Sequence, residues 1–188
     1  MVYKKYTIPI SIFIIFENVN PVLWTSDSFG PNNYILYINQ SWFYAINNFF
    51  KNDVFFSQSM LLENSAYDNK NNFFKKQIFF LNKLTLYYIY YFFTFKSKII
   101  LLQPLESKFG VFKSIDKIFK SAGWLERETG EMFKVSFSSK VDIRRLLLDY
   151  SKKENPLTKE YPVEGFNDVF YSFFDDQVIY NTSTNVEL

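Results

Sequence analysis

The sequence predicts an α+β fold, in which a small mixed or antiparallel sheet carries helices on one face and a long extended C-terminal segment follows. Runs of aromatic and β-branched residues, typical of strands, alternate with stretches whose apolar residues recur at helical spacing. After residue 150 both patterns stop, and Pro and Gly punctuate the chain. We therefore expect an N-terminal extension and loop (residues 1–33), an α+β domain (34–150) and an extended tail lying on partner proteins (151–188).

The first elements predicted are an extension, a strand and a helix. Residues 1–16 form a short basic start and a β-branched apolar run, which favours an N-terminal strand or packed extension, and residues 17–33 favour a loop. Residues 34–38 have the composition of a strand. Ser41 can cap a helix that follows. The apolar face of that helix would consist of Trp42, Ala45, Ile46, Phe49 and Phe50.

A long hairpin is predicted in the middle of the chain. Residues 54–56 suggest a short strand, and the polar residues 64–72 suggest a loop. The aromatic stretch is densest at residues 84–95, which predicts a long strand covered on both faces. A tight turn at 96–98 leads into a second strand at 99–103, so the two strands form an antiparallel hairpin.

Two helices are predicted after the hairpin. The first would end at Gly123 in a left-handed cap, and its apolar residues at helical spacing are Val111, Phe112, Ile115, Ile118, Phe119 and Ala122. Residues 124–133 predict a second, short helix with Thr129 on its inner side. Core packing is the favoured interpretation for the large apolar residues of this helix, Trp124, Leu125, Met132 and Phe133, which would pin it to the sheet. Residues 175–188 are expected to form a surface tail.

Aromatic residues make up 22% of the chain, with 24 Phe and 14 Tyr, and runs of Lys and Asn accompany them. One interpretation is functional, with the rings serving as stacking platforms for bases. The other is mutational, because the codons for Phe, Tyr, Asn, Lys and Ile are rich in A and T. We favour the mutational interpretation, which points to a gene in the AT-rich genome of an organelle.

Composition excludes several classes of site. A net charge of +2 argues against a protein that coats a polyanion. The chain has no Cys and no His, which removes thiol nucleophiles, iron–sulfur ligands, the commonest metal ligand and the usual proton-transfer group. A soluble hydrolase therefore lacks any recognisable machinery here. The apolar runs at 7–16 and 84–95 are shorter than the roughly twenty residues that cross a bilayer as a helix.

Three motifs occur in order between residues 114 and 165. Residues 124–133 contain Glu-Arg-Glu and end in Glu-Met-Phe, residues 141–150 contain Asp-Ile-Arg-Arg-Leu-Leu-Leu-Asp-Tyr, and residues 155–162 read Asn-Pro-Leu-Thr-Lys-Glu-Tyr-Pro. This arrangement resembles the 30-kDa subunit family of respiratory complex I, the NADH dehydrogenase subunit 9 type when encoded in an organelle. The family pattern has the same three motifs at the same spacing.

The sequence departs from the family pattern at several positions. Lys134 stands where the family has Gly, so a turn that needs positive φ there would have to be built differently. Residues 138–140 replace the family's Asn-His-Pro, and Asn155 and Thr158 stand in place of a His and an Arg. These changes would affect the contacts with partner proteins that the missing side chains make in the family.

The charged residues of the three motifs allow three interpretations. Arg127 and Glu131 are four apart on the expected helix and would pair, so a solvated charged face is the simplest interpretation. Paired carboxylates could instead serve acid–base chemistry or hold Mg²⁺. The family resemblance favours a third, a protein interface with no catalytic, cofactor-binding or metal-binding residue. The expected interface residues are Glu126, Arg127, Glu128, Glu131, Asp142, Arg144, Arg145, Asp149, Tyr150, Pro156, Leu157, Lys159 and Pro162.

The resemblance implies a non-catalytic structural subunit of NADH:ubiquinone oxidoreductase, in the quinone module of the matrix-facing peripheral arm at the mitochondrial inner membrane. Its partners would be other complex I subunits, chiefly the 49-kDa subunit, with indirect membrane association and no nucleic acid. NADH, FMN, iron–sulfur clusters and ubiquinone would be bound by those partner subunits. The alternative is a divergent mitochondrial ribosomal protein, which should show a basic excess and salt-sensitive RNA binding.

Overall fold

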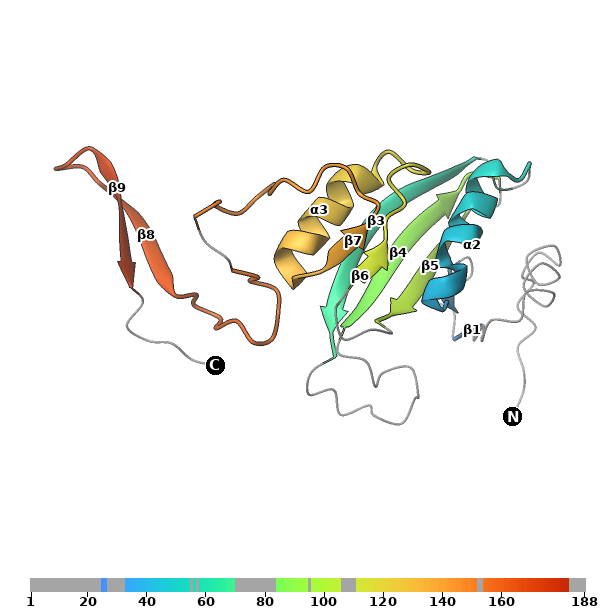
Figure 1. The fold of residues 1–188 in the computed structure, drawn as a ribbon, viewed down its shortest axis with the longest axis horizontal. Helices are drawn as coiled ribbons and strands as arrows, with labels where there is room; N and C mark the ends of the chain where they lie inside the picture. Colours follow the sequence, from blue (N-terminus) through green and yellow to red (C-terminus); the bar gives the residue numbers. More distant parts are fainter. Residues whose placement is uncertain are drawn as a thin grey trace.

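Among the residues that the structure describes, the main body is a mixed five-stranded sheet with two helices on one face (Figure 1). The structure, a computed structural model, describes residues 25–26, 33–54, 56, 58–69, 84–94, 96–105, 111–151 and 154–182. The predicted N-terminal strand or extension at 1–16 lies outside these residues. The predicted α+β class, with helices on one face of a small mixed sheet, is confirmed.

The sheet has the strand order β1-β2-β5-β4-β3. The antiparallel hairpin of β4 and β5 confirms the prediction for this part of the chain, with Ile89 opposite Ile100. β3 extends the sheet antiparallel to β4, β2 runs parallel to β5, and β1 pairs antiparallel with β2. The strands are β1 (Thr25–Ser26), β2 (Asn33–Tyr37), β3 (Ser59–Asp68), β4 (Leu84–Phe92) and β5 (Ser97–Pro104).

β4 is buried fully on the face that carries the helices. Along this strand side chains alternate between the two faces of the sheet. Tyr87, Ile89 and Tyr91, on the opposite face, are only partly buried. The prediction of a strand covered on both faces is therefore correct for one face only. The covered side chains are Leu84, Leu86, Tyr88, Tyr90 and Phe92.

Helix α2 (Gln40–Asn52) forms where the sequence predicted a helix, but its inner face is rotated from the predicted one. The N-cap is Asn39 rather than Ser41, and no side chain caps the helix. Trp42 and Ala45, which we expected inside, are exposed. The residues that the helix buries are Phe43, Ile46, Asn47 and Phe50.

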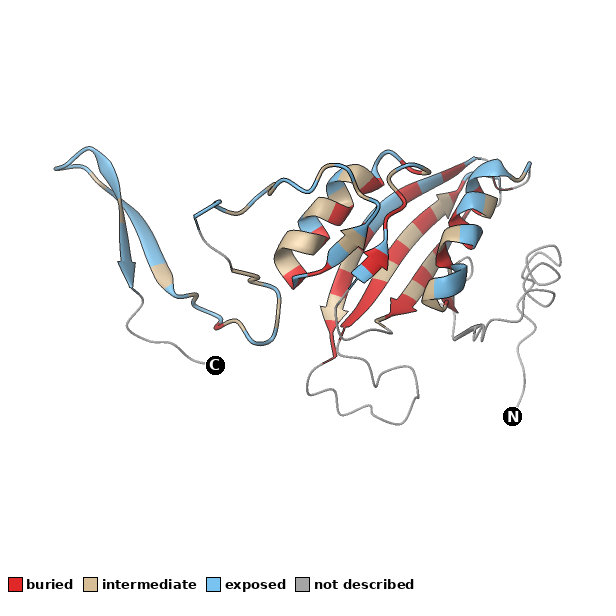
Figure 2. Ribbon diagram, in the orientation of Figure 1, coloured by how far each residue is buried: buried red, intermediate tan, exposed pale blue. Residues whose placement is uncertain are grey.

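Aromatic rings fill the space between α2 and the sheet, and both α2 and the strands carry buried residues (Figure 2). Phe43 lies against Tyr88, with ring centroids 4.6 Å apart, and Phe50 lies edge-on to Phe92 at 5.0 Å. Each buried ring contributes roughly 1.5–3 kcal/mol to the free energy of unfolding. These aromatics are core residues and not an exposed platform for bases.

Two segments of the domain differ from the prediction. Residues 64–68, expected in a loop, belong to β3, because pairing with β4 outweighs the low strand propensity of their polar side chains. The amide of Asn69, at the end of this strand, donates to Thr85 Oγ1 over 2.9 Å. Residues 54 and 56 lie in turns, so the strand predicted at 54–56 is wrong.

The helix predicted over residues 111–122 is also wrong. Residues 111–113 form β6 (Val111–Lys113), which pairs in parallel with β7 (Ser136–Ser138), and turns follow. Helix α3 (Ala122–Phe133) begins only then, so Gly123 lies in its first turn and ends no helix. In the turns, the amides of Ile118 and Phe119 both donate to Ile115 O over 2.9 Å. Such turns bury apolar residues three or four apart, which imitates the spacing of a helix.

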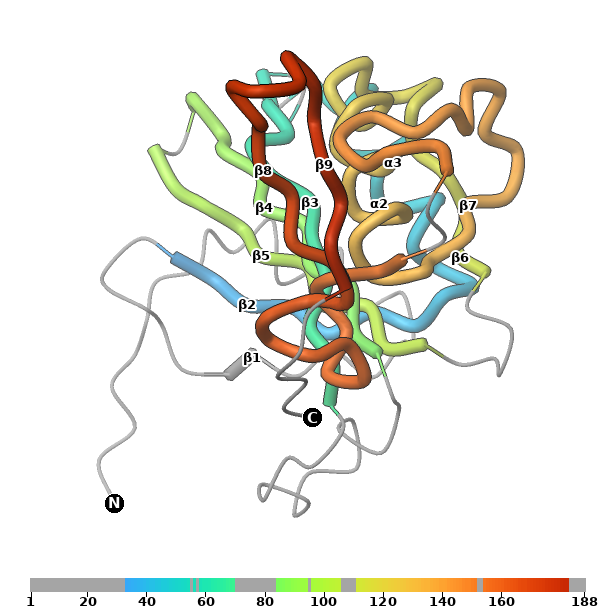
Figure 3. Tube along the Cα trace, turned by 90° about the vertical axis from the view of Figure 1, so that its left-hand side faces the viewer, coloured from blue at the N-terminus to red at the C-terminus, as the bar shows by residue number. Residues whose placement is uncertain are grey.

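The last part of the chain is irregular as far as residue 166 and then forms a hairpin of β8 (Asn167–Ser172) and β9 (Gln177–Thr182). The strands of this hairpin are extended, as predicted for the C-terminal segment, but their pairing was not predicted. The hairpin stands away from the sheet and both helices (Figure 1). Viewed from that end, α2, α3, β6 and β7 lie together on one side of the sheet (Figure 3). Neither α2, with 13 residues, nor α3, with 12, has the length and apolarity that a bilayer-spanning helix in the described residues would need.

Candidate functional site

The predicted site residues gather around α3. This helix buries one side chain per turn against the sheet, and the buried residues are Ala122, Glu126, Thr129 and Phe133. Leu125 and Met132 pack at the edge of the core, as predicted, but Trp124 is 64% exposed, so its predicted burial is wrong. Glu128 lies exposed on the outer side of the helix.

Glu126 is fully buried, and the expectation that it is a surface charge is wrong. Its carboxylate accepts hydrogen bonds from the amide of Ile115 at 2.8 Å and the hydroxyl of Ser114 at 2.6 Å. The buried ammonium of Lys140 lies 3.0 Å away. Burial raises the pKa of the Glu126 carboxyl, although these donors and the Lys140 charge act in the opposite direction. Glu126 therefore joins α3 to the turns before it and to the chain after β7.

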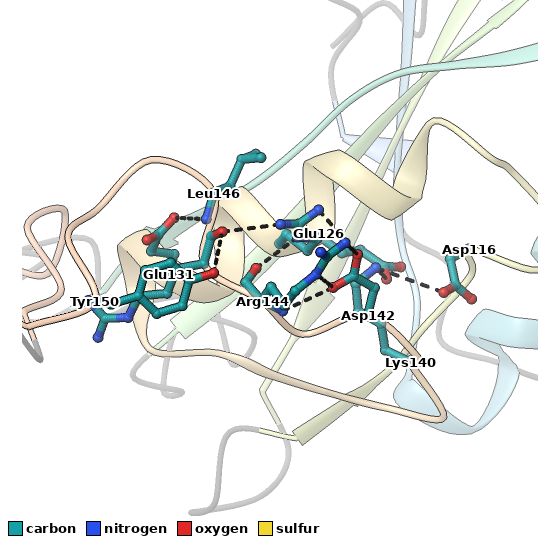
Figure 4. Close-up of polar contacts among 10 residues, drawn as sticks. Asp116, Glu126, Glu131, Lys140, Asp142, Arg144, Leu146 and Tyr150 are labelled. Atoms are coloured by element: carbon teal, nitrogen blue, oxygen red, sulfur yellow. Dashed lines mark hydrogen bonds and ion pairs between the residues drawn. The ribbon is translucent and has the colours of Figure 1, made fainter.

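Arg127 on α3 binds the segment that follows β7, and Figure 4 labels Asp142, Arg144 and Leu146 of this segment. We call residues 141–151 the strap. The guanidinium of Arg127 donates to the carbonyl oxygens of Arg144 at 2.8 Å and Arg145 at 3.1 Å, and it lies 3.4 Å from Asp142. These partners replace the predicted pair with Glu131. Because a guanidinium presents several donors in a fixed fork, Arg127 can bind three groups of the strap at once.

Glu131 forms the second attachment of the strap. Its carboxylate accepts hydrogen bonds from three consecutive backbone amides, those of Leu146, Leu147 and Leu148, at distances of 2.8 to 3.1 Å. Burial alone would raise the pKa of Glu131, but the three amides outweigh it, and the pKa is lowered. An ionised carboxylate is therefore the form that binds the strap.

Asp142 and Arg144 form an exposed pair within the strap. Two guanidinium nitrogens of Arg144 donate to the two carboxylate oxygens of Asp142, at 3.0 and 2.8 Å. These bonds from Arg144 hold the pKa of Asp142 far below its usual range, and the charge of Arg127 adds to the effect. The Arg144 side chain is 75% exposed, so the pair is accessible to another molecule.

The end of the strap places the remaining charged and aromatic residues of the second motif at the surface. Arg145 donates to the carbonyl oxygen of Asp149 over 2.6 Å, and the Asp149 carboxylate accepts from the amide of Ser151. Tyr150 is exposed, and its hydroxyl lies 3.4 Å from Arg145 O.

The third motif is bound to α3 and β3, although the sequence predicted that it belongs to an extended tail. The amide of Asn155 donates to Glu131 O over 2.7 Å, and Leu157 N donates to Met132 O over 3.2 Å. The amide of Lys159 donates to the Asp68 carboxylate on β3. Successive turns fold this segment, which corrects the extended prediction. Leu157 and Lys159 are exposed, Pro156 is half-buried and Pro162 is buried.

Sequence reasoning missed Lys140 and Asn155 as contributors, and it counted both only as departures from the family pattern. The signal for Lys140 was available, because Glu126 has the same helical spacing as Thr129 and Phe133 and so had to face the core. A carboxylate on that face requires a cation or donors nearby.

The outer side of the site combines exposed apolar and charged side chains. In the part of the chain that the structure describes, no three His, Cys, Asp or Glu side chains gather as the ligands of a metal ion would. The carboxylates of Glu126 and Glu131 are both bound inside the chain. Large apolar side chains of the strap and its surroundings point outward instead, namely Trp124, Val141, Ile143, Leu147, Tyr150 and Leu157. A mixture of exposed aromatic, aliphatic and Arg side chains is typical of protein interfaces.

Comparisons with known proteins give one consistent family. Residues 36–167 match the family model described as the 30 Kd subunit of respiratory-chain NADH dehydrogenase. The chain is 31% identical to NADH-ubiquinone oxidoreductase subunit 9 of Paramecium primaurelia over 98% of this chain and 88% of that protein. It is 46% identical to NADH dehydrogenase [ubiquinone] iron-sulfur protein 3 of Marchantia polymorpha, over 35% of this chain and 34% of that protein.

Solved structures share the fold at low sequence identity. A trypsin-resistant fragment of Nqo5 superimposes with a TM-score of 0.57 at 12% identity, covering 70% of this chain and 96% of the fragment. A chain of the membrane-bound sulfane sulfur reductase, an archaeal respiratory membrane complex, gives a TM-score of 0.61 at 13% identity, covering 80% of this chain and 83% of that chain.

Proposed function

Because the chain belongs to the family of the 30-kDa subunit of respiratory-chain NADH dehydrogenase, we propose that it is a non-catalytic structural subunit of mitochondrial NADH:ubiquinone oxidoreductase. In this proposal it belongs to the quinone module of the matrix-facing peripheral arm, with the 49-kDa subunit as its chief partner, and it reaches the inner membrane only through the complex. NADH, FMN, iron–sulfur clusters and ubiquinone are bound by partner subunits. The ribosomal alternative receives no support from the family match.

The observation that carries the structural role is the hairpin of β8 and β9. Isolated two-stranded hairpins are marginally stable in water, yet this one stands away from its own domain (Figure 1). Phe173 at its tip is 89% exposed, and Phe174 is fully exposed. One face of the hairpin consists of exposed apolar side chains, those of Val169, Tyr171, Val178 and Tyr180. An apolar surface of this kind marks a protein-binding site.

The charge of the C-terminal segment that contains the hairpin favours one kind of binding partner. Residues 160–188 contain six acidic residues and no Lys or Arg, so this segment has a net charge of −6, whereas the preceding residues have a net charge of +8. Asp175 and Asp176 follow the exposed Phe pair at the tip. A partner surface with an apolar groove and a basic rim would complement both features. The hairpin would then be ordered by the partner and not by its own core.

The proposal is tested by double substitution at the hairpin tip, Phe173→Ser with Phe174→Ser, in a tagged copy of the full chain expressed in mitochondria. Native gels in mild detergent should show the unmodified chain comigrating with NADH dehydrogenase activity, and the double variant at least tenfold less incorporated, since truncating aromatic anchors costs about 2 kcal/mol or more. The matched control is Val54→Ser, an exposed residue on the main body.

A chain that migrates apart from the NADH dehydrogenase activity contradicts the proposal. A double variant that assembles normally but lowers turnover contradicts the structural role, because it would place the tip in the reaction itself.

A further inference from the structure

An open cleft of about 430 Å³ lies between the C-terminal half of α3, β7 and the strap. Val135, Phe137 and the backbone at Gly130 line its inner side. A Cβ atom at Gly130 would lie 2.9 Å from Val135 O, so only Gly permits this close approach of the chain to the helix. The volume is within the range of sites that bind small molecules or the side chains of a peptide.

The side chains that line the cleft carry an excess of positive charge. Five Lys and Arg side chains line it, against two carboxylates, Glu126 and Glu131. Both carboxylates are bound inside the chain, Glu126 by Lys140 and Glu131 by the strap amides. Asp142, which pairs with Arg144, and Asp116, which lies 3.9 Å from Lys140, compensate two more positive charges. A net positive charge therefore remains around the cleft.

Two of these cations are available to another molecule. Lys134 is exposed at the end of α3, and among the described residues no carboxylate pairs with its ammonium group. Arg144 binds Asp142 through Nε and Nη2, which leaves the Nη1 amino group for a further acceptor. Arginine forks bind carboxylates well because their planar geometries match.

An apolar side chain adjoins these cations. Ile143 lines the cleft and is 79% exposed. A small inorganic anion would leave it in water, whereas a peptide can place a carboxylate between Lys134 and Arg144 and an apolar neighbour against Ile143. Burying such a contact adds to affinity in proportion to the apolar area removed from water.

We propose that this cleft binds an acidic segment of a partner protein, with one Asp or Glu carboxylate held between Lys134 and Arg144 and an adjacent apolar residue packed on Ile143. The inference rests on the proposed function, because the partner is another subunit of the same complex. It assigns the cleft a role distinct from that of the hairpin, which presents acidic and apolar groups of its own.

The test uses the intact complex and a carbodiimide, which joins an amine to a carboxylate only where the two are in contact. Mass spectrometry should find Lys134 coupled to an Asp or Glu of a different subunit. In a parallel sample labelled with an amine-reactive acetyl ester, Lys134 should be at least tenfold less modified in the complex than in chain released from it by denaturant. Lys120, which is exposed outside the cleft, is the control for reagent access.

Two results would overturn the inference. If Lys134 is acetylated as fast in the complex as in the released chain, no partner covers the cleft. Coupling of Lys134 to Asp168, Asp175 or Asp176 means that the acidic hairpin of this chain, or of a second copy, occupies it instead. Both results are measured on complex in which the chain has been identified, so they leave the proposed function intact. Absence of the chain from the complex overturns the proposed function itself.

Discussion

Lys134 ends α3 in the left-handed backbone region, with φ 59° and ψ 42°, although this region favours glycine. The turn of the family pattern is thus kept without Gly, and a non-Gly residue in this conformation costs about 1 kcal/mol. We expect Lys134→Gly to raise the free energy of unfolding by about 1 kcal/mol, measured by urea denaturation of the full chain. Lys120→Gly, at a residue without positive φ, should not stabilise it. Equal or lower stability of Lys134→Gly would show that the conformation carries no strain.

Glu131 makes the attachment of the strap dependent on pH. A carboxyl group whose pKa is lowered in the folded state stabilises the fold fully at pH values above its pKa in the unfolded chain, near 4.5. This stabilisation is lost as the pH falls through the pKa of the folded state. Exchange of the amides of residues 146–148, corrected for intrinsic rates, should therefore become faster as the pH is lowered below about 4.5. In Glu131→Gln the protection should be weaker and nearly independent of pH over this range. A pH dependence that persists in Glu131→Gln would assign the effect to another group.

At the scale of single residues, the sequence identified the charged groups of the site but not their partners. Arg127 and Glu131 were expected to bind each other, because residues four apart on a helix are neighbours. Both bind the strap instead, where several backbone groups satisfy each side chain. Such contacts depend on the path of the chain between residues 134 and 148, and no spacing rule encodes that path.

Helix α3 has two aromatic residues with opposite roles. Phe133 is buried against the core, whereas Trp124 is exposed, with the guanidinium of Arg127 5.4 Å from its ring. Phe133→Ala should lower the free energy of unfolding by about 3–5 kcal/mol, and Trp124→Ala by less than about 1 kcal/mol. Trp124→Ala should nevertheless reduce incorporation into the complex. Equal losses of stability in the two variants, measured by urea denaturation, would restore the sequence-based prediction that Trp124 is a core residue.

At the scale of elements, local pairing was predictable and distant pairing was not. The β4–β5 hairpin has both strands and its turn within one stretch of sequence, so the composition of that stretch was enough to predict the hairpin. The second half of β3 is largely polar and pairs with β4 in a distant part of the sequence, with Asn64 opposite Tyr88. β6 and β7 pair across the whole of α3, which no local pattern between residues 111 and 122 could indicate.

At the scale of the whole molecule, the strap should act in assembly and not in turnover. Arg144→Ala with Arg145→Ala removes two cations from the exposed side of the strap and leaves the carbonyl groups that Arg127 binds. We expect the amount of assembled complex to fall several-fold, with the rate of ubiquinone reduction per assembled complex unchanged. Lys117→Ala with Lys120→Ala, on exposed residues away from the strap, is the control. Normal assembly with lost turnover would be incompatible with a structural role.

The parallel pairing of β2 with β5 also sets an order of events during synthesis. Ile35 lies beside Ile100, so β2 and α2 leave the ribosome well before the strand that completes their side of the sheet. At about 5–20 residues per second this delay is roughly 3–13 s, during which the sheet that covers the apolar face of α2 is incomplete. Nascent chains at this stage are therefore a natural target for chaperones, and a slower ribosome would lengthen the interval in which they can aggregate.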